Sequence, residues 1–410
     1  MKGRNFSDRD LERQEAKRDI WREVLDGIDE IKAGGGKMSV ALPQGNQCNR
    51  DEKKENHHGP VEIVVPPGGK IPNIESYCSL LLPFAIQDDY CRINNIGCVA
   101  SENDDDFCVV QTDDHHFSLL PGPEFSPRLY RGQTCFHDQC VPSLFRLQKN
   151  QIGYLTALLK KYEFHKLIAG SHPIIGYLQN WTIDGKYFKI DMEGLSQHYE
   201  FATSMIDVTR SKDIAMFFAL CERTATSNRY EPITDGNREV VLYTVNLKAL
   251  LENNYPNFHI IGFQALPRPD LQKAYSLFIG HKDNFNIVPF VSYERFRVKR
   301  KESEKYFQMF DEGKSLFPED DIVTNMAQEI RESKEIDREV LETCYQRHWI
   351  PKILANTSEL VKFLNTFGYV VAEKILEFSA EQKRKIIEKW NSNPPLNSDR
   401  VKCRFVYEPR

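Results

Sequence analysis

Apolar residues recur at steps of three and four positions in several parts of the chain, which is the spacing of a helix with one buried face. This pattern predicts helices over residues 7–31, 152–169, 336–349 and 358–368. A further helix is expected to begin at 318–321. Ser379 and Gln382 have the spacing of a capping box, which predicts one more helix start before Ile386 and Trp390.

Short apolar runs bounded by turn residues indicate strands between these helices. The candidate strands are residues 61–65, 128–131, 240–245, 258–263 and 287–291. Ser211 is a candidate N-cap for a helix that is apolar on most sides and therefore buried, and Asp213 would lie at the positive end of its dipole.

The order of these elements predicts an α+β protein with three parts. Residues 1–110 are expected to form an N-terminal helix and an irregular α/β extension. Residues 111–330 hold the mixed core, and residues 331–410 form a helical C-terminal region.

The composition limits the partners and the compartment. The chain has 410 residues, with 54 lysines and arginines against 59 acidic residues, and this balance argues against a strongly basic nucleic-acid-binding face. It contains no apolar run that could span a bilayer, and its charged start does not have the pattern of a signal peptide, so we expect no membrane partner and a cytoplasmic location. The ten cysteines have no CxxC spacing and are interpreted as free thiols, with Cys91–Cys98 and Cys135–Cys140 as alternative metal pairs.

Two segments carry the candidate chemistry. In the first, Arg131 comes at the end of a predicted strand and is followed by Gly132, so a phosphate or carboxylate could approach both the guanidinium and the backbone. The second begins at Gly194 and contains the pair His198 and Tyr199. We expect these segments to form two walls of one pocket.

Each of these residues also has a purely structural interpretation. Arg131 could pair with Asp207 inside the core, and His198 could be a core histidine with satisfied hydrogen bonds. Thr209 and Ser211 could simply end a strand and cap a helix. Gln272 could be an exposed helix residue.

Five sequence segments resemble the FRG domain family, which is named for a Phe-Arg-Gly tripeptide. The matching segments are 130–132 (Tyr-Arg-Gly), 142–146, 197–209, 215–219 and 268–272. The resemblance extends from about residue 115 to residue 330 and implies that residues 111–330 are an FRG domain. The chain departs from the family pattern at four positions of the longest segment. These are Glu200 for glycine, Ala202 for proline, Ser204 for arginine and Val208 for tryptophan.

The order of these segments also resembles the plan of ADP-ribosyltransferases, which implies a central mixed or antiparallel split sheet flanked by helices. In that plan an arginine holds NAD, a Thr/Ser strand shapes the nicotinamide slot, and a third position stabilises the charge on the ribose. The resemblance assigns Arg131 to the first place, Thr209 and Ser211 to the second, and Gln272 to the third. Glu294 is the alternative for the third place.

This resemblance implies further roles for individual residues. Arg131, Gly132 and Gln133 would bind the NAD phosphates, and Tyr199 or Tyr130 would stack on nicotinamide. His198 would bind a ribose hydroxyl or act as an acid or base. Asp207, Thr209 and Ser211 would complete the NAD site. Because Gln272 cannot ionise, a base would come from Glu200, Asp207 or Glu294.

Two functions follow from these observations. The first is an NAD-dependent ADP-ribosyltransferase that modifies an intracellular protein or nucleic acid, as a toxin or anti-phage effector would. The alternative is a non-catalytic module that binds a ligand in the same Arg131 cleft and a protein partner on the C-terminal helices. No metal is expected, since no paired carboxylates or His-x-x-x-His cluster offers ligands.

Overall fold

The computed structural model describes residues 69–71, 106–121, 128–224, 229–252, 258–259, 261, 264, 266–279, 283–318, 321–347, 356–392, 402–404 and 406–407. Two compact units are present: residues 59–336 with 374–410, and residues 1–58 with 337–373. The expected N-terminal helix, the strand at 61–65 and most of the 1–110 extension lie outside the described residues.

The larger unit is built around a six-stranded sheet in which every neighbouring pair of strands is antiparallel. In spatial order the strands are β11 (Phe258–His259), β12 (Ala274–Phe278), β7 (Met205–Thr209), β4 (Arg128–Gln133), β10 (Glu239–Asn246) and β13 (Val291–Arg297). The central neighbours β4 and β7 pair only at Tyr130 and Thr209. The sheet therefore divides at its centre, between the β11–β12–β7 half and the β4–β10–β13 half.

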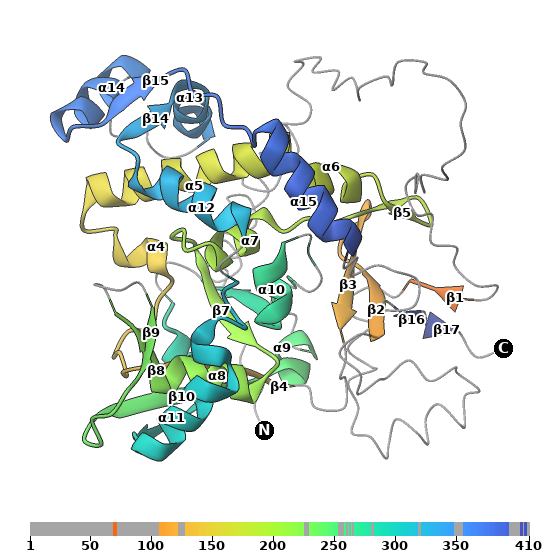
Figure 1. Ribbon diagram of the computed structural model, residues 1–410, viewed down its shortest axis with the longest axis vertical. Helices are drawn as coiled ribbons and strands as arrows, with labels where there is room; N and C mark the ends of the chain where they lie inside the picture. Colours follow the sequence, from red (N-terminus) through yellow and green to blue (C-terminus); the bar gives the residue numbers. More distant parts are fainter. Residues whose placement is uncertain are drawn as a thin grey trace, which may run out of the picture. The chain divides into compact units, whose positions relative to one another are not determined.

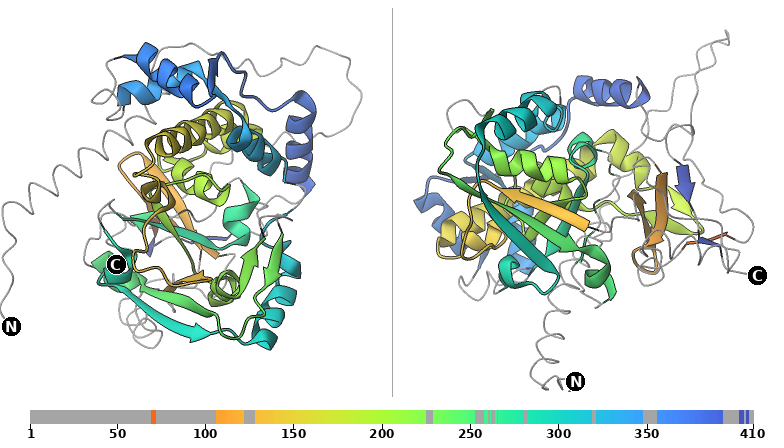
Figure 2. Two further views of the ribbon diagram at one scale, coloured as in Figure 1. Left: turned by 90° about the vertical axis from the view of Figure 1, so that its left-hand side faces the viewer. Right: turned by 90° about the horizontal axis from the view of Figure 1, so that it is seen from below.

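Two helices lie side by side on one face of this sheet, α8 (Lys212–Leu220) and α11 (Arg300–Met309) (Figure 2). Helix α8 packs so closely against β4 that a Cβ atom at Gly132 would overlap the carbonyl oxygen of Ala215 and lie 2.7 Å from the backbone nitrogen of Ala219. The glycine of the Tyr-Arg-Gly motif is thus required for packing between strand and helix. The expected approach of a phosphate to the backbone at Gly132 stays a prediction.

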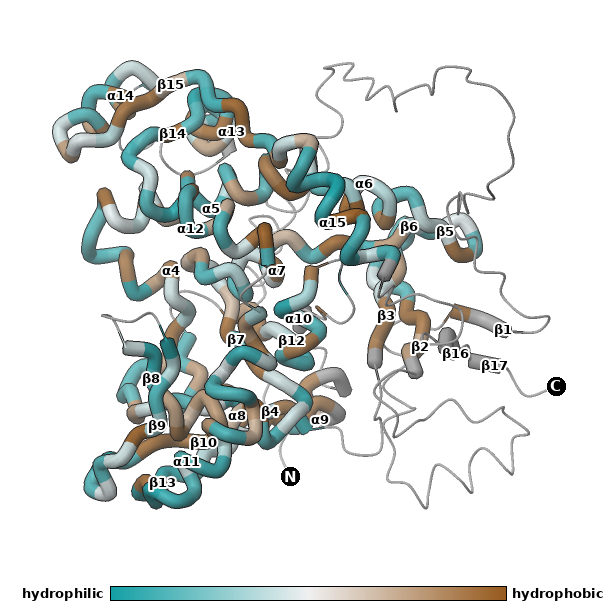
Figure 3. The backbone as a smooth tube through the Cα atoms, in the orientation of Figure 1, coloured by the Kyte–Doolittle hydropathy of each residue, from teal (hydrophilic) through white to brown (hydrophobic). Residues whose placement is uncertain are grey.

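A second sheet of five strands mixes parallel and antiparallel pairs. Its strands are, in order, β16 (Lys402–Arg404), β2 (Asp106–Gln111), β3 (His116–Pro121), β6 (Lys186–Phe188) and β5 (Thr182–Ile183). Strand β2 is buried on both faces: Phe107 and Val109 pack with Trp181, whereas Cys108 and Val110 join the core of the six-stranded sheet. Strands β2 and β3 are accordingly mostly hydrophobic, and α11 is mostly polar (Figure 3).

A helical layer lies beside the sheets in the larger unit (Figure 1). It contains α5 (Gln151–Ser171), α6 (Pro173–Leu178), α7 (Met192–His198), α12 (Ile322–Glu332) and α15 (Ala380–Ser392). Phe164, Leu195, Phe201 and Phe378 are buried together in its core. Helix α15 begins with the expected capping box, in which the Ser379 N–H donates to Gln382 Oε1 and the Gln382 N–H donates to Ser379 Oγ.

The remaining elements are short. In the larger unit they are β1 (Gly69–Lys70), α4 (Ser143–Arg146), β8 (Cys221–Arg223), β9 (Tyr230–Pro232), α9 (Leu247–Glu252), α10 (Pro267–Leu271), the 3₁₀ helices η1 (Phe285–Ile287) and η2 (Asp311–Gly313), and β17 (Val406–Tyr407). The other unit contains α13 (Arg338–Arg347), α14 (Thr357–Thr366) and β15 (Val370–Ala372), and β14 (Glu335–Asp337) spans the boundary.

The structure confirms the α+β class and most of the predicted elements within the described residues. The strand predicted over 287–291 is wrong, because η1 occupies Phe285–Ile287 and β13 starts only at Val291. The side chain of Asn284 accepts the N–H of Asn286, which stabilises that turn. The expected domain boundaries at residues 110 and 330 stay predictions.

Candidate functional site

Two neighbouring cavities lie at the division of the six-stranded sheet. The large cavity has a volume of about 450 Å³ and the small cavity about 260 Å³. The large cavity is lined by Tyr130, Arg131, Gly132, Gln133, Thr134, His137, His198, Asp207, Val208, Thr209, Ala215, Phe218, Cys221, Glu222, Arg223, Tyr230 and Gln272. The small cavity is lined by Arg131, Ser143, Arg146, Gln197, Glu200, Phe201, Ala202, Met205, Ile206 and Asp207.

Arg131 and Asp207 line both cavities and therefore form the border between them. Because β4 and β7 share only one residue pair, the Arg131 guanidinium reaches across, and its Nη1 donates to the backbone oxygen of Asp207 at 2.9 Å. The two side chains form no ion pair with each other among the described contacts. The structural interpretation of Arg131 and Asp207 as a core salt bridge is therefore wrong, because Arg131 is held by the Asp207 backbone oxygen.

His198 and Gln272 meet on the wall of the large cavity, as the functional hypothesis required. Gln272 Nε2 donates to the backbone oxygen of Leu316 at 3.1 Å, so its Oε1 must accept, and His198 Nδ1 lies 2.8 Å from it. The His198 proton is therefore on Nδ1, which leaves Nε2 with a free lone pair in the neutral ring. Gln272 is only 6% exposed, so its interpretation as an exposed helix residue is wrong.

Three buried polar atoms at these cavities have no hydrogen-bond partner among the described residues: Arg131 Nε, His198 Nε2 and Asp207 Oδ1. His198 Nε2 lies 3.8 Å from Asp207 Oδ1, which is too far for a hydrogen bond but close enough for a charge interaction if the ring is protonated. Buried polar atoms are nearly always paired in folded proteins. Unpaired atoms concentrated on one cavity wall are what a site built for a polar ligand would have.

The strand β7 ends in a network that holds the cavity wall. Thr209 Oγ1 donates to the backbone oxygen of Gln272 at 2.8 Å and accepts the N–H of Ser211. Ser211 Oγ in turn accepts the N–H of Ile214, so Ser211 is the N-cap of α8 as predicted. Thr209 lines the large cavity, whereas Ser211 is not among its lining residues.

Besides Ser211, two expected contributors lie away from both cavities, Tyr199 and Glu294. Tyr199 is fully buried, and its hydroxyl donates to Asp321 Oδ2 at 2.7 Å. Burial and the neighbouring Asp321 raise its pKa well above the ordinary value. Its ring packs against Phe164, so it is not available to stack on nicotinamide, although Tyr130 does line the large cavity. Glu294 is an exposed residue of the edge strand β13 and lines neither cavity.

Three of the four departures from the FRG pattern lie on the cavity walls. Glu200 and Ala202 line the small cavity, and Val208 lines the large one. Glu200 has a φ of 68°, a left-handed conformation that favours the glycine of the family pattern. The departures therefore change the lining of the cavities.

The Glu200 carboxylate is surrounded by three arginines. It lies 2.6 Å from Arg223, 3.1 Å from Arg331 and 3.4 Å from Arg268. Burial alone would raise the pKa of this carboxyl, but Arg331 and Arg223 outweigh burial and lower it. A carboxylate held in its charged form by three cations is a weak proton acceptor, which argues against Glu200 as the base.

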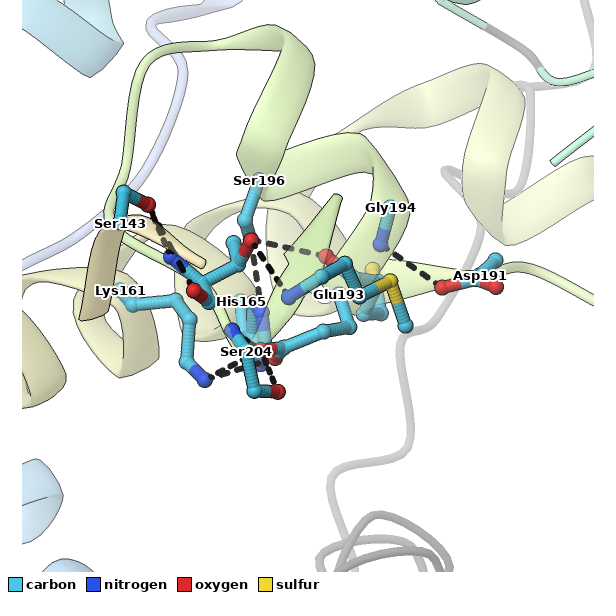
Figure 4. Close-up of polar contacts among 11 residues, drawn as sticks. Ser143, Lys161, His165, Asp191, Glu193, Gly194, Ser196 and Ser204 are labelled. Carbon is cyan, nitrogen blue, oxygen red and sulfur yellow. Dashed lines mark hydrogen bonds and ion pairs between the residues drawn. The ribbon is translucent and has the colours of Figure 1, made fainter. Parts of the chain in front are cut away.

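The fourth departure, Ser204, belongs to a polar network with residues of α5 and α7 (Figure 4). Its hydroxyl and N–H both donate to Glu193 Oε1, and Lys161 Nζ forms an ion pair with Glu193 at 2.7 Å. In the same network His165 Nε2 lies 2.7 Å from Ser196 Oγ, which itself donates to the backbone oxygen of Met192. Where the family pattern has an arginine, this chain thus places a serine and balances Glu193 with Lys161.

Arg268, from the Arg-x-x-x-Gln segment, lies in the core and holds the backbone of His198. It is 3% exposed, and its Nη1 donates to the backbone oxygen of His198 at 3.0 Å. Its guanidinium lies over the rings of Tyr199 and Phe317. This explains the arginine and the glutamine of that segment together: the first fixes the His198 backbone, and Gln272 fixes its ring.

Several lining residues were not singled out as site residues from the sequence. Arg146 is the last residue of the family segment 142–146, and that match was the available signal. Arg223 and Tyr230 come from the strands β8 and β9, and no sequence pattern indicated that these two strands would line the cavity. Burial raises the pKa of the Cys221 thiol on the same wall to about 12, so this thiol is not a reactive nucleophile.

Within the described ranges, no three His, Cys, Asp or Glu side chains gather where they could bind a metal ion. The described helices include none with the length and apolar character needed to cross a membrane.

The comparisons with known proteins agree with this geometry in one respect. No curated protein and no solved structure gave a significant match to the chain. The model of the FRG domain family matches residues 126–228, a segment that includes β4, α5, α7, β7 and α8 and supplies most of the cavity walls. The chain therefore contains an FRG domain at residues 126–228.

Proposed function

We propose that this FRG domain is an NAD-dependent ADP-ribosyltransferase-like enzyme that binds NAD in the large cavity and modifies a protein or nucleic-acid acceptor. The observation that carries the proposal is the convergence of Arg131, His198 and Gln272, from three distant parts of the sequence, on that cavity. Arg131 and His198 each contribute a buried polar atom without a described partner.

The arrangement of the strands supports the comparison with the ADP-ribosyltransferase plan. Arg131 is on β4, Thr209 ends the adjacent strand β7, and the two strands meet at a single residue pair in an antiparallel sheet. Helix α8 follows Thr209 directly and buries its apolar face against β4. The first and second places of the plan are thus neighbours, and Gln272 contacts Thr209 through its backbone oxygen.

The side chains present suit NAD as a substrate. The Arg131 guanidinium would bind a phosphate, and the apolar part of the wall, with Tyr130 and Phe218, would accept the nicotinamide ring. Asp207 supplies the carboxylate that the third place of the plan lacks here, since Gln272 is an amide. Its side chain is 39% exposed and faces both cavities.

The reaction would proceed by departure of neutral nicotinamide, which leaves positive charge on the ribose. The Asp207 carboxylate would stabilise that charge electrostatically. The acceptor nucleophile would then form the new bond to the ribose carbon, and its proton would pass to His198 Nε2. Gln272 acts on this step by holding the His198 proton on Nδ1. It is therefore a positioning residue and not a proton acceptor.

The setting of the reaction is proposed from the resemblance alone. An intracellular effector of the toxin or anti-phage kind, acting in the cytoplasm, would suit an activity that consumes NAD and modifies macromolecules.

A non-catalytic binding module is the second candidate, and one observation favours it. Both ends of the Gln272 amide are already engaged within the protein, and the third place of the plan has no carboxylate. In that case the large cavity would bind its ligand without breaking a bond.

Incubation of the purified chain with NAD, followed by measurement of released nicotinamide, separates the two functions. The enzyme proposal expects release by the wild type, and its loss in Arg131→Gln and in His198→Asn. Arg128→Gln is the matched control, because Arg128 is an exposed residue of the same strand that lines neither cavity. Binding of NAD by the wild type without nicotinamide release would support the binding module instead.

A further inference from the structure

We propose that the small cavity is a phosphate-binding subsite in which Arg146 is the second cation beside Arg131. The group it would take is a phosphate or pyrophosphate. Arg146 has no assigned role in the proposed reaction, and the small cavity lies on the other side of Arg131 from His198 and Gln272.

Arg146 is held at this cavity by its own short helix. The N–H of Leu144 donates to the backbone oxygen of Thr203 at 3.1 Å, and the N–H of Thr203 donates to Ser143 Oγ. These bonds fix α4 against the segment that leads into β7. Arg146 closes α4, lines the small cavity and remains accessible to solvent at its rim.

The two guanidiniums lack acidic partners among the described residues. Among the described residues, the Arg131 side chain forms one hydrogen bond, to the backbone oxygen of Asp207, and the Arg146 side chain forms none. Two effects lower the pKa of Arg146: partial burial is the larger, and the positive charge of Arg131 is the second. The second effect shows that the two guanidiniums are close enough to repel each other. Two neighbouring cations without a counter-ion favour binding of an anion, and the planar fork of arginine fits phosphate oxygens in pairs.

The acidic groups on the cavity do not cancel this charge. Glu200 faces Arg223, Arg268 and Arg331, so its negative charge is more than balanced. Asp207 is at the border, with Oδ1 directed towards His198. The remaining lining residues that bear on an anion are neutral, and Ser143 and Gln197 already bond to backbone oxygens.

The shared border suggests how one ligand would occupy both cavities. A nucleotide whose ring and sugar lie in the large cavity could extend its phosphates past Arg131 into the small one. This part of the inference rests on the proposed function, because it takes the ligand to be NAD or its ADP-ribose part. The anion subsite itself does not depend on any reaction.

Titration calorimetry with inorganic pyrophosphate, and separately with ADP-ribose, tests the subsite on the full chain. We expect wild type and Arg128→Gln to bind pyrophosphate alike, and Arg146→Gln and Arg131→Gln to bind it about tenfold more weakly or worse. Arg146→Lys should recover part of the affinity, because it keeps the charge but loses the fork. Unfolding curves for each variant show whether the fold is retained.

The outcomes separate this inference from the proposed function. If pyrophosphate binding depends on Arg146 but the protein releases no nicotinamide, the phosphate subsite is supported and the proposed enzymatic activity is contradicted. If Arg146→Gln releases nicotinamide with the same kcat and KM as the wild type, the phosphate subsite is contradicted and the proposed enzymatic activity is supported. Equal pyrophosphate affinity in wild type and Arg146→Gln, or no binding of either probe to the wild type, overturns the inference. Binding of pyrophosphate but not ADP-ribose would limit the subsite to free phosphates and contradict its link with a nucleotide.

Discussion

Two polar clusters of the FRG domain are built from similar residues but differ in how completely they are paired. In the network of α5 and α7, Lys161 pairs with Glu193, and His165 with Ser196. On the wall of the large cavity, the ring of His198 is hydrogen-bonded through Nδ1, and its Nε2 has no hydrogen-bond partner among the described residues. The ring of His165 is hydrogen-bonded to the Ser196 hydroxyl, which itself donates to the Met192 backbone oxygen. The ring of His198 lines the large cavity.

The difference indicates separate roles. A buried polar network with every group paired fixes the geometry of the core, and its members are expensive to remove one at a time. Unpaired polar atoms that line a cavity contribute less to stability in the free protein, and they are positioned to bind a ligand. The first cluster should therefore respond to mutation in stability, and the second in binding.

The largest effect on stability is expected for Lys161→Ala. This change leaves the Glu193 carboxylate buried without its cation, which should cost about 3–5 kcal/mol in the free energy of unfolding. Denaturant unfolding measures it. The double variant Lys161→Met with Glu193→Gln should recover much of the loss, since no charge is then left unpaired. A loss below about 1 kcal/mol, the range of exposed ion pairs, would break the comparison.

Gly132→Ala tests the packing of α8 on β4. The new methyl group would overlap the carbonyl oxygen of Ala215, so strand and helix must separate, at a cost of roughly 1–3 kcal/mol or more. Gly170→Ala is the control: Gly170 is in α5, a Cβ there meets nothing within 4 Å, and alanine should stabilise the helix by up to about 1 kcal/mol. An unchanged unfolding free energy in Gly132→Ala would contradict this close packing of α8 on β4.

Acid sensitivity should come from the buried histidines. Burial lowers the pKa of His172 to about 3, and burial with Lys161 lowers that of His165 to about 4, from an ordinary 6.5. Below pH 6.5 these two histidines bind protons in the unfolded chain but stay neutral in the folded protein. For each histidine, the free energy of unfolding therefore falls by about 1.4 kcal/mol per pH unit until the pKa of the folded state is reached.

His172→Asn should reduce this slope while keeping a good N-cap for α6, because the His172 ring only accepts the N–H of Ile175 there. Unfolding at a series of pH values between 6.5 and about 4 measures the slope. The exposed His115→Asn controls for the substitution. A slope equal to that of the wild type would show that His172 is protonated in the fold.

The smallest effect on stability is expected at the cavity. Arg131→Gln removes one hydrogen bond to the Asp207 backbone, worth about 0.5–1.5 kcal/mol. The same denaturant experiment as for Lys161 measures it. A cost as large as that of Lys161→Ala would mean that Arg131 is a core residue and that the two clusters do not differ.

The sequence predicted elements well where local chemistry decides them. Ser379 with Gln382 and Ser211 form the predicted caps because a cap needs only neighbours a few residues away. The apolar run at 287–291 was misassigned because composition does not separate a strand from a turn that Asn284 stabilises.

The site was predictable only as far as the motif reached. Arg131, His198 and Gln272 were predicted to share a cavity wall, and they do. The fixed orientation of Gln272 depends on Leu316, 44 residues away, and the burial of Tyr199 depends on Asp321. Contacts of this kind are set by the tertiary fold and leave no local pattern in the sequence.

Calorimetric titration of NAD into the wild type and Arg131→Gln tests the central claim most directly. The account predicts that the wild type binds NAD and that the variant, although folded, binds it about ten- to a hundredfold more weakly, because charged hydrogen bonds contribute roughly 1.5–3 kcal/mol. Equal affinity of the two proteins, or no binding of NAD to the wild type, would contradict it.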